Sequence, residues 1–148
     1  MIKIKYIELL TEVKNKTLEK FANIPTFLDG DVSEGIKRPS FLLTLNRIKS
    51  SDFMTEAIDK SMTVRMYYFP KNRDINMTEN LNTIDTLNDL FLNDSKIIVG
   101  NELVNIDELE LDIIDKVVHC YFDVNITEEY IRIDDKDSEL MEDLEYKQ

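Results

Sequence analysis

The chain is poor in the residues that carry most protein chemistry. Its 148 residues include one histidine, one cysteine, three glycines and no tryptophan. The single cysteine, Cys120, has no partner for an intramolecular disulfide, and metal sites built from Cys and His need more ligands. Three glycines supply neither a phosphate-cradling loop nor a Gly-x-Ser-x-Gly nucleophile elbow. We therefore expect no enzyme activity, no cofactor and no metal site.

Long hydrophobic runs are also missing. The chain has no stretch of about 18 apolar residues and no basic start followed by an apolar core and a cleavage site. We expect no membrane association and a cytoplasmic location. Hydrophobic residues still make up 43% of the chain, and a chain of this length buries roughly two thirds of its unfolded surface. The composition predicts one domain with an ordinary core.

Charge is distributed unevenly along the chain. Residues 1–73 carry 13 Lys and Arg against 9 Asp and Glu, or +4, whereas residues 74–148 carry 5 against 21, or −16. The acidic half would repel nucleic acid, so binding to DNA through it is not expected. The surplus carboxylates are explained either by a solvated surface or by an assembly in which a basic flank meets an acidic one.

Hydrophobic periodicity predicts two helices. The first is expected to end near Asn23 and Pro25, and its apolar stripe is Ile7, Leu10, Val13, Leu18 and Phe21. The second is predicted over 77–93, because Asn76 and Glu79 form a capping pair ahead of an apolar row. That row comprises Met77, Leu81, Ile84, Leu87 and Phe91.

Other stretches indicate strands. Short strands are expected at 26–32 and 109–113, and Gly100 and Asn101 predict a tight hairpin between 96–99 and 103–106. The last strand is predicted over 117–126, with Cys120 buried on its apolar face as a small hydrophobe and His119 on the opposite face. These two neighbours therefore cannot form a catalytic pair. The fold class is a single α+β domain with a mixed, mainly antiparallel sheet packed against two main helices.

The segment from Gly35 to Pro70 contains the two longest predicted strands. Pro39 precedes a strand over 40–48, and Pro70 closes a strand over 62–69 whose side chains alternate cleanly between two faces. The intervening crossover, 46–60, is polar but contains apolar side chains that a solvated loop does not need. It is interpreted as either a short packed helix or a surface arm that contacts another chain. These apolar residues are Phe53, Met54 and Ile58.

The order of these features resembles a known family. The segment begins with a glycine turn, the basic residue Arg38 and Pro39, and continues with an aromatic-aliphatic strand, a polar loop and a strand that ends in Tyr-Phe-Pro at Pro70. This order resembles that of the tail terminator proteins of phages and phage-tail-like particles of Gram-positive bacteria. By order of elements the similarity covers residues 1–126. The expected domain boundaries are a tail-terminator-like domain at 1–133 and an acidic tail at 134–148.

The resemblance implies a structural role. Tail terminators form a ring, usually of six subunits, that caps the last ring of the tail tube, stops its growth and offers a surface to the head or neck. Expected partners are other copies of the chain, the tail tube protein and possible sheath, neck or connector proteins, while DNA passes through the lumen without specific binding. The expected location is the host cytoplasm during assembly and then the virion tail or tail-like particle. We expect partner binding through Arg38, Phe53, Met54, Ile58, Arg65, Glu110, Asp112, Leu140 and Leu144.

Several alternatives stay open. The acidic half is also typical of an inhibitor that mimics DNA, and another head-tail connector subunit would share most of these features. Glu108, Glu110 and Asp112 are interpreted as either a solvated strand face or an acid-base or Mg²⁺ site. Residues 134–148 are either a frayed terminus or an amphipathic turn that forms on a partner, since Leu140 and Leu144 lie four residues apart.

Overall fold

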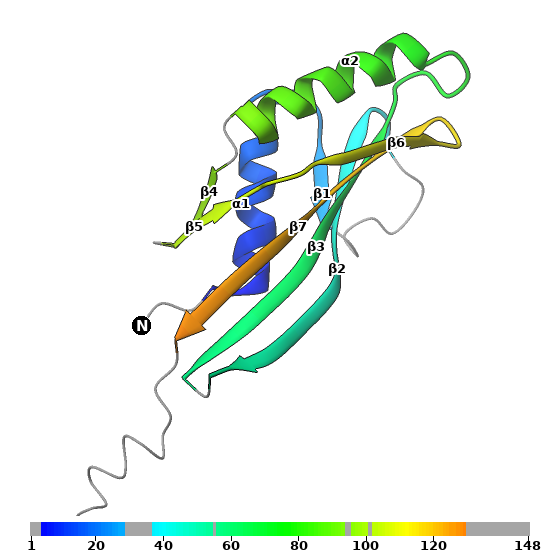
Figure 1. Ribbon diagram of the computed structural model, residues 1–148. Helices are drawn as coiled ribbons and strands as arrows, with labels where there is room; N and C mark the ends of the chain where they lie inside the picture. The colour runs from blue at the N-terminus through cyan, green and yellow to red at the C-terminus, as the bar shows by residue number, and fades with distance from the viewer. Residues whose placement is uncertain (1–3, 29–36, 55, 94–95, 101, 130–148) are drawn as a thin grey trace, which may run out of the picture.

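The computed structural model describes residues 4–28, 37–54, 56–93, 96–100 and 102–129. They form one α+β domain, which confirms the predicted fold class (Figure 1). A five-stranded sheet has the order β1-β2-β3-β7-β6, and β4 (Lys96–Val99) and β5 (Glu102–Asn105) form a separate two-stranded sheet.

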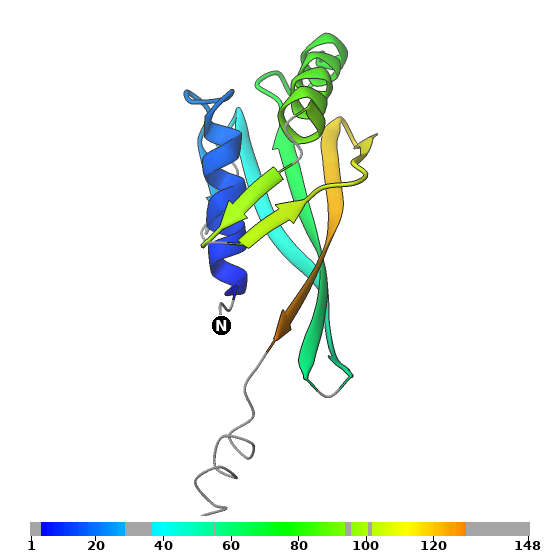
Figure 2. The ribbon, with the colours of Figure 1, turned by 60° about the vertical axis from the view of Figure 1, so that its left-hand side comes forward.

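The large sheet is antiparallel except at one edge. The edge strand β1 (Thr26–Leu28) runs parallel to β2 (Ser40–Phe53). The strands β2, β3 (Ala57–Phe69), β7 (Val117–Glu129) and β6 (Glu110–Ile114) then pair antiparallel in that order. Helix α1 (Tyr6–Leu18) and the β4–β5 hairpin contact each other on one face of the sheet, and α2 (Met77–Asn88) lies across one end of it (Figures 1 and 2).

The core lies between this sheet and the helices. Strand alternation sets it, because successive side chains point to opposite faces. The predicted alternation of β3 and β7 is confirmed, and the buried residues of these two strands are Met62, Val64, Met66, Tyr68, Val118, Cys120, Phe122, Val124 and Ile126. We call this buried face the inner face. The opposite, outer face has no helix over it among the described residues.

Helix α1 differs in detail from its prediction. It ends at Leu18 rather than near Asn23, and Ile7 is 57% exposed although it was placed on the apolar stripe. The buried side is rotated toward Leu9, which is fully buried. Thr17 is also buried, and its hydroxyl donates to the carbonyl of Val13 at 2.8 Å, so its polar group is satisfied within the helix.

Helix α2 and the π-helical turn η1 (Asp89–Asn93) together occupy the predicted helical span. The predicted apolar row is wrong at its start, since Met77 is 72% and Leu81 48% exposed. Asn80 is buried instead, and its side-chain amide donates to the carbonyl of Lys116 at 3.1 Å. Leu87 and Phe91, further along the predicted row, are fully buried, and the hydrogen bond of Asn80 to the β6–β7 turn adds a polar contact on the same side of the helix.

The predicted capping pair is also wrong. Asn76 makes no side-chain cap hydrogen bond. The Glu79 carboxylate accepts hydrogen bonds from the Tyr68 hydroxyl at 2.6 Å and from the backbone N–H of Lys71 at 2.7 Å. Glu79 therefore ties α2 to the end of β3 instead of closing the helix terminus.

The crossover between β2 and β3 is neither a helix nor an irregular loop. Both strands continue through it, pairing from Lys49 with Ser61 to Phe53 with Ala57. A β-bulge at Arg47 and Ile48 separates this outer hairpin, residues 49–61, from the rest of the sheet. We call it the arm, and it extends beyond the start of α1 (Figures 1 and 2). The packed-helix interpretation is wrong, and the surface-arm interpretation describes the observed shape.

The β4–β5 hairpin turns at the glycine that the sequence predicted. Gly100 has φ of +65°, a conformation that favours glycine, and it connects β4 to β5 as predicted. The predicted strand at 26–32 is seen as β1 only, since residues 29–32 lie outside the described ranges. None of the described helices is long and apolar enough to cross a membrane.

Candidate assembly surface

The outer face carries aromatic and charged side chains in rows that cross the sheet. One row is set by register: Thr44 on β2 pairs with Arg65 on β3, Arg65 with Tyr121 on β7, and Tyr121 with Glu110 on β6. The Arg65 guanidinium lies 4.4 Å from the centre of the Tyr121 ring. A hydrogen bond and the charge of Glu110 raise the pKa of the Tyr121 phenol. This row places a cation, an aromatic ring and an anion on neighbouring strands.

The next row contains the single histidine. His119 pairs with Tyr67 on one side and with Asp112 on the other, and its ring meets the Tyr67 ring edge-on at 4.8 Å. Burial lowers the pKa of His119, and the nearby charge of Arg65 adds to this effect, while Asp112 and Asp115 oppose it. The imidazole is therefore held toward its neutral form.

A groove of about 580 Å³ runs across this part of the outer face. Its wall is mostly apolar and aromatic, and the side chains that line it are Leu42, Thr44, Asn46, Tyr67, Phe69, Ile114, Asp115, Val117 and His119. At one end the Arg38 guanidinium lies 5.7 Å from the centre of the Phe69 ring and donates to the carbonyl of Pro70 at 3.1 Å. Arg38 therefore closes that end with a positive charge.

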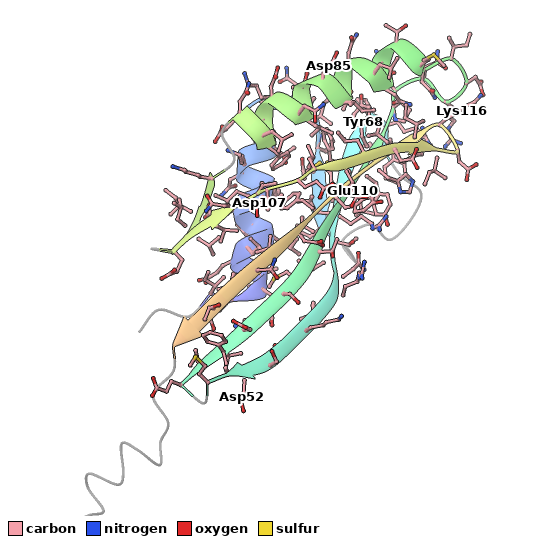
Figure 3. All side chains as sticks on the ribbon, viewed as in Figure 1. Asp52, Tyr68, Asp85, Asp107, Glu110 and Lys116 are labelled. Atoms are coloured by element: carbon pink, nitrogen blue, oxygen red, sulfur yellow. The ribbon has the colours of Figure 1, made fainter. Side chains whose placement is uncertain are left out.

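The arm exposes apolar side chains. Met54 at its tip is 77% exposed and Phe53 is 44% exposed. Met54 also has φ of +53°, which is strained for a residue other than glycine. Ile58 is half-buried and lies on the inner face, on the opposite side of the arm from Phe53. Asp52 lies beside them near the arm's end (Figure 3).

A buried ion pair holds the base of the arm. The Lys60 ammonium lies 3.0 Å from the Glu128 carboxylate, and both side chains are more than 90% buried. Glu128 also accepts from the backbone N–H of Ile4 at 2.6 Å, and Lys60 donates to the carbonyl of Ile4 at 3.3 Å. The pair therefore connects β3, β7 and the segment that leads into α1.

Both sides of the sheet have open strand edges. Within the described residues, β1 pairs with β2 at Phe41–Leu43 and β6 pairs with β7 at Val117–Tyr121. Beyond these positions, β2 as far as Phe53 and β7 as far as Glu129 each have β3 on one side and, within the described residues, no strand on the other. Such edges present unpaired backbone groups to other chains.

The two open sides differ in charge. Arg47 and Lys49 are exposed on β2, and we call them the basic flank. Glu110, Asp112 and Asp123 are exposed on β6 and β7, and we call them the acidic flank. Figure 3 shows Glu110 on this side of the sheet, with Asp107 nearby and Lys116 at the β6–β7 turn. The β2 side therefore carries mainly positive charge and the β6–β7 side mainly negative charge, and Arg47 and Asp123 line a common pocket between them on the outer face.

The structure brings together part of the predicted site. One group lies on the outer face or at its rim and comprises Arg38, Arg65, Glu110 and Asp112. A second group lies on the arm and comprises Phe53, Met54 and Ile58. Leu140 and Leu144 lie outside the described residues. Sequence reasoning missed Tyr67, His119 and Tyr121, although period-two alternation had already placed Tyr67 on the same face as Arg65. The missing information was the order of the strands.

Cys120 is not available for chemistry. It is 1% exposed on the inner face, and burial raises the pKa of its thiol to about 12. This confirms the prediction that it packs as a small hydrophobe. No three His, Cys, Asp or Glu side chains gather in a way that would hold a metal ion in the part of the chain that the structure describes.

Open sheet edges that differ in charge, an arm with exposed apolar side chains and an aromatic outer face define a class of protein: a structural α+β domain suited to contacts with other protein chains. The model of a family described as phage tail terminator protein matches residues 8–138, and the chain belongs to this family. The resemblance drawn from residues 35–70 is thereby confirmed at the level of the family.

A comparison with curated proteins gives no match. Membership of the family makes the chain a structural protein of tail completion and virion assembly. It therefore interacts with other tail or virion proteins and belongs in the virion tail.

Proposed function

We propose that copies of this chain form a closed ring that caps the head-proximal end of the tail tube and stops its elongation. The observation that carries the proposal is the family match over residues 8–138, and the two open, oppositely charged sides of the sheet supply a geometry for it. A ring needs each copy to present two unlike surfaces that fit each other.

In this ring the basic flank of one copy meets the acidic flank of the next. Arg47 and Lys49 on β2 approach Glu110, Asp112 and Asp123 of the neighbour, and the open edges of β2 and β7 allow strand addition between copies. Because the contact is heterologous, it repeats around an axis until the rotation closes. The number of copies expected from the family resemblance is six.

The arm supplies a second contact. A two-stranded extension with exposed Phe53 and Met54 is suited to enter an apolar pocket of another chain, where a few buried anchors give most of the binding free energy. We assign this contact to the tail tube or to the adjacent copy. Sheath, neck and connector proteins are further partners on the head-proximal side of the ring.

Charge favours passage of DNA through such a ring. The chain has a net charge of −12, so a ring of several copies is strongly negative as a whole, repels phosphates and does not retain DNA in its lumen. This follows from the charge alone and needs no base contact.

Negative-stain imaging of the full chain, alone and mixed with purified tail tube protein, tests the proposal. We expect rings, and tubes that carry a ring at one end and grow no further when more tube protein is added. A particle that stays monomeric alone and leaves tube length unchanged would contradict it. A ring that ignores the tube but binds head proteins would favour the connector alternative.

A further inference from the structure

We propose that the loop before helix α2, residues 71–76, and the first turns of that helix bind the head-proximal neighbour of the ring, through a surface of that protein that is acidic around an apolar pocket. We call residues 71–76 the α2 loop. The inference deepens the proposed function and rests on it in one respect, because it needs a ring with two different sides.

The α2 loop and the start of α2 expose large apolar side chains. Ile75 is 83% exposed, and Met77 and Leu81, which lie one helical turn apart, are exposed beside it in sequence. An apolar residue just before a helix cap often packs against the fourth helical residue, but here that residue is Asn80, which is buried and polar. Ile75 is therefore left to solvent, and exposed apolar side chains that occur together indicate a contact with another protein.

The loop that carries Ile75 is held by hydrogen bonds. The side-chain oxygen of Asn72 accepts from the backbone N–H groups of Asp74 at 2.9 Å and Ile75 at 3.0 Å. The Asn76 side chain donates to the carbonyl of Asn72 at 3.0 Å. From the β6–β7 turn, the Lys116 ammonium donates to the carbonyl of Asp74 at 3.0 Å. The loop is thus ordered before it binds, and an ordered loop loses less conformational entropy on binding.

The surroundings of the loop are basic although the chain as a whole is acidic. Arg38 donates to the carbonyl of Pro70, which places Lys37 beside the start of the loop. The loop and the side chains next to it carry five basic against three acidic residues, or +2, whereas the whole chain carries −12. The basic residues are Lys37, Arg38, Lys71, Arg73 and Lys116, and the acidic residues are Asp74, Glu79 and Asp115. Charge complementarity therefore favours a partner surface rich in carboxylates.

The α2 loop and the arm lie at opposite ends of strand β3. The arm tip precedes Ala57 and the loop follows Phe69, about 40 Å along the strand at roughly 3.3 Å per residue. Figure 3 shows Lys116 at the loop end of the sheet and Asp52 at the arm end. An arm that contacts the tube leaves the opposite end of the molecule facing the head. This position assigns the loop to the head-proximal partner.

Site-specific cross-linking identifies the partner. Cys120, the one cysteine of the chain, is buried, so in Ile75→Cys a maleimide reaches the new thiol. The chain, labelled with benzophenone maleimide, is assembled on tubes, mixed with the purified connector protein of the same virion and irradiated. Mass spectrometry should identify an adduct with the connector, whereas Ile98→Cys, at an exposed position of β4, should give none. Adducts with tube protein or a second copy instead, no adduct, or equal connector adducts from both positions would overturn the assignment.

Binding of the connector protein to the immobilised chain measures the apolar contact. Ile75→Gln with Met77→Gln should weaken binding at least about tenfold, as for loss of buried anchors. The matched control is Ile98→Gln with Leu103→Gln, an exposed cross-strand pair on the β4–β5 hairpin, which should leave binding unchanged. Circular dichroism and thermal unfolding establish that both variants are folded. Equal effects of the two pairs would overturn the proposal.

Two further variants separate order and charge from apolar contact. Asn72→Ala keeps every exposed side chain but removes the acceptor that orders the loop, so it should weaken binding by a smaller factor and speed hydrogen exchange at the amides of Asp74 and Ile75. Lys71→Gln with Arg73→Gln should reduce the dependence of binding on salt. Salt dependence that these changes leave intact would contradict an acidic partner surface.

Tube length separates this inference from the ring proposal. The Ile75→Gln and Met77→Gln variant should cap tubes as the unmodified chain does, since neither residue belongs to the flanks or the arm. Failure of the unmodified chain to cap tubes would contradict the ring proposal, while the contact with the connector is still measured on the free chain. Unchanged connector binding by the variant would remove this inference and leave the ring proposal standing.

Discussion

At the residue scale, two polar contacts secure the ends of the sheet. Lys60 and Glu128 form a buried ion pair at the arm, and Tyr68 and Glu79 form a short hydrogen bond at the α2 end. Sequence analysis had placed Glu79 in a helix cap, because spacing along the chain reveals neighbours in sequence only. Its true partners, Tyr68 and the backbone of Lys71, come from a strand end that the fold brings close.

Removal of one member of the buried pair should be strongly destabilising. Lys60→Met leaves the Glu128 carboxylate buried with the Ile4 amide as its remaining described partner, which should lower the free energy of unfolding by about 3–5 kcal/mol. Urea denaturation measures the change. The double variant Lys60→Met with Glu128→Leu should recover much of the loss. A single-variant effect below about 1 kcal/mol would show that the pair is not buried in solution.

Glu79 should make stability depend on acid. Burial raises the pKa of its carboxyl, but hydrogen bonds from Tyr68, Lys71 and Asn72 outweigh this, so the folded pKa lies below 4.5. The ionised group therefore stabilises the fold above pH 4.5, and this contribution is lost as the pH falls through the folded pKa. Glu79→Gln should reduce the loss of stability below pH 4.5, measured by urea denaturation. An unchanged acid limb would contradict this.

At the element scale, the alternation of apolar and polar residues predicted strands β3 and β7 well and the arm poorly. In β3 and β7 one face is buried, so the period of two is visible in the residue types. In the arm most side chains of β2 are exposed on both faces, and the polar stretch was therefore interpreted as a crossover. In helix α2 the start of the buried side was predicted wrongly, because Asn80 is a polar residue that is buried with a hydrogen bond to the carbonyl of Lys116. Apolar periodicity does not identify a buried polar residue.

A substitution at the arm tip should separate stability from assembly. Met54 has φ of +53°, so Met54→Gly relieves backbone strain and should leave the free energy of unfolding unchanged or raise it by up to about 1 kcal/mol. The same change removes an exposed apolar anchor and should weaken binding to the tube or to other copies. Thermal unfolding and co-sedimentation with tubes measure the two effects. Equal loss of both would contradict a binding role for the arm.

At the scale of the whole molecule, the uneven charge along the sequence indicated that the folded protein has surfaces of different charge, but it did not indicate where they lie. The basic half of the sequence supplies β2 and β3 and the acidic half supplies β6 and β7, but the strand order β1-β2-β3-β7-β6 decides that they end on opposite sides of the sheet. Strand order depends on long-range pairing, which one sequence does not reveal. The family was predictable from residues 35–70, whereas the surface that it uses was not.

Reversal of one flank should prevent assembly, and reversal of both should restore it. Arg47→Glu with Lys49→Glu makes both flanks acidic, so copies repel each other, and Glu110→Lys with Asp112→Lys makes the opposite flank basic. A chain with all four changes again presents unlike flanks. Each pair of changes lies at exposed positions, so the fold, checked by circular dichroism, should be retained.

The most direct test is the particle mass of these chains by native mass spectrometry, with tail tube protein present and absent. We predict a closed multiple of the chain mass for the unmodified protein, monomers for either pair of reversals alone, and return of the multiple for the fourfold variant. Folded reversal variants that assemble as the unmodified chain does, or a fourfold variant that stays monomeric, would contradict a ring built from these flanks.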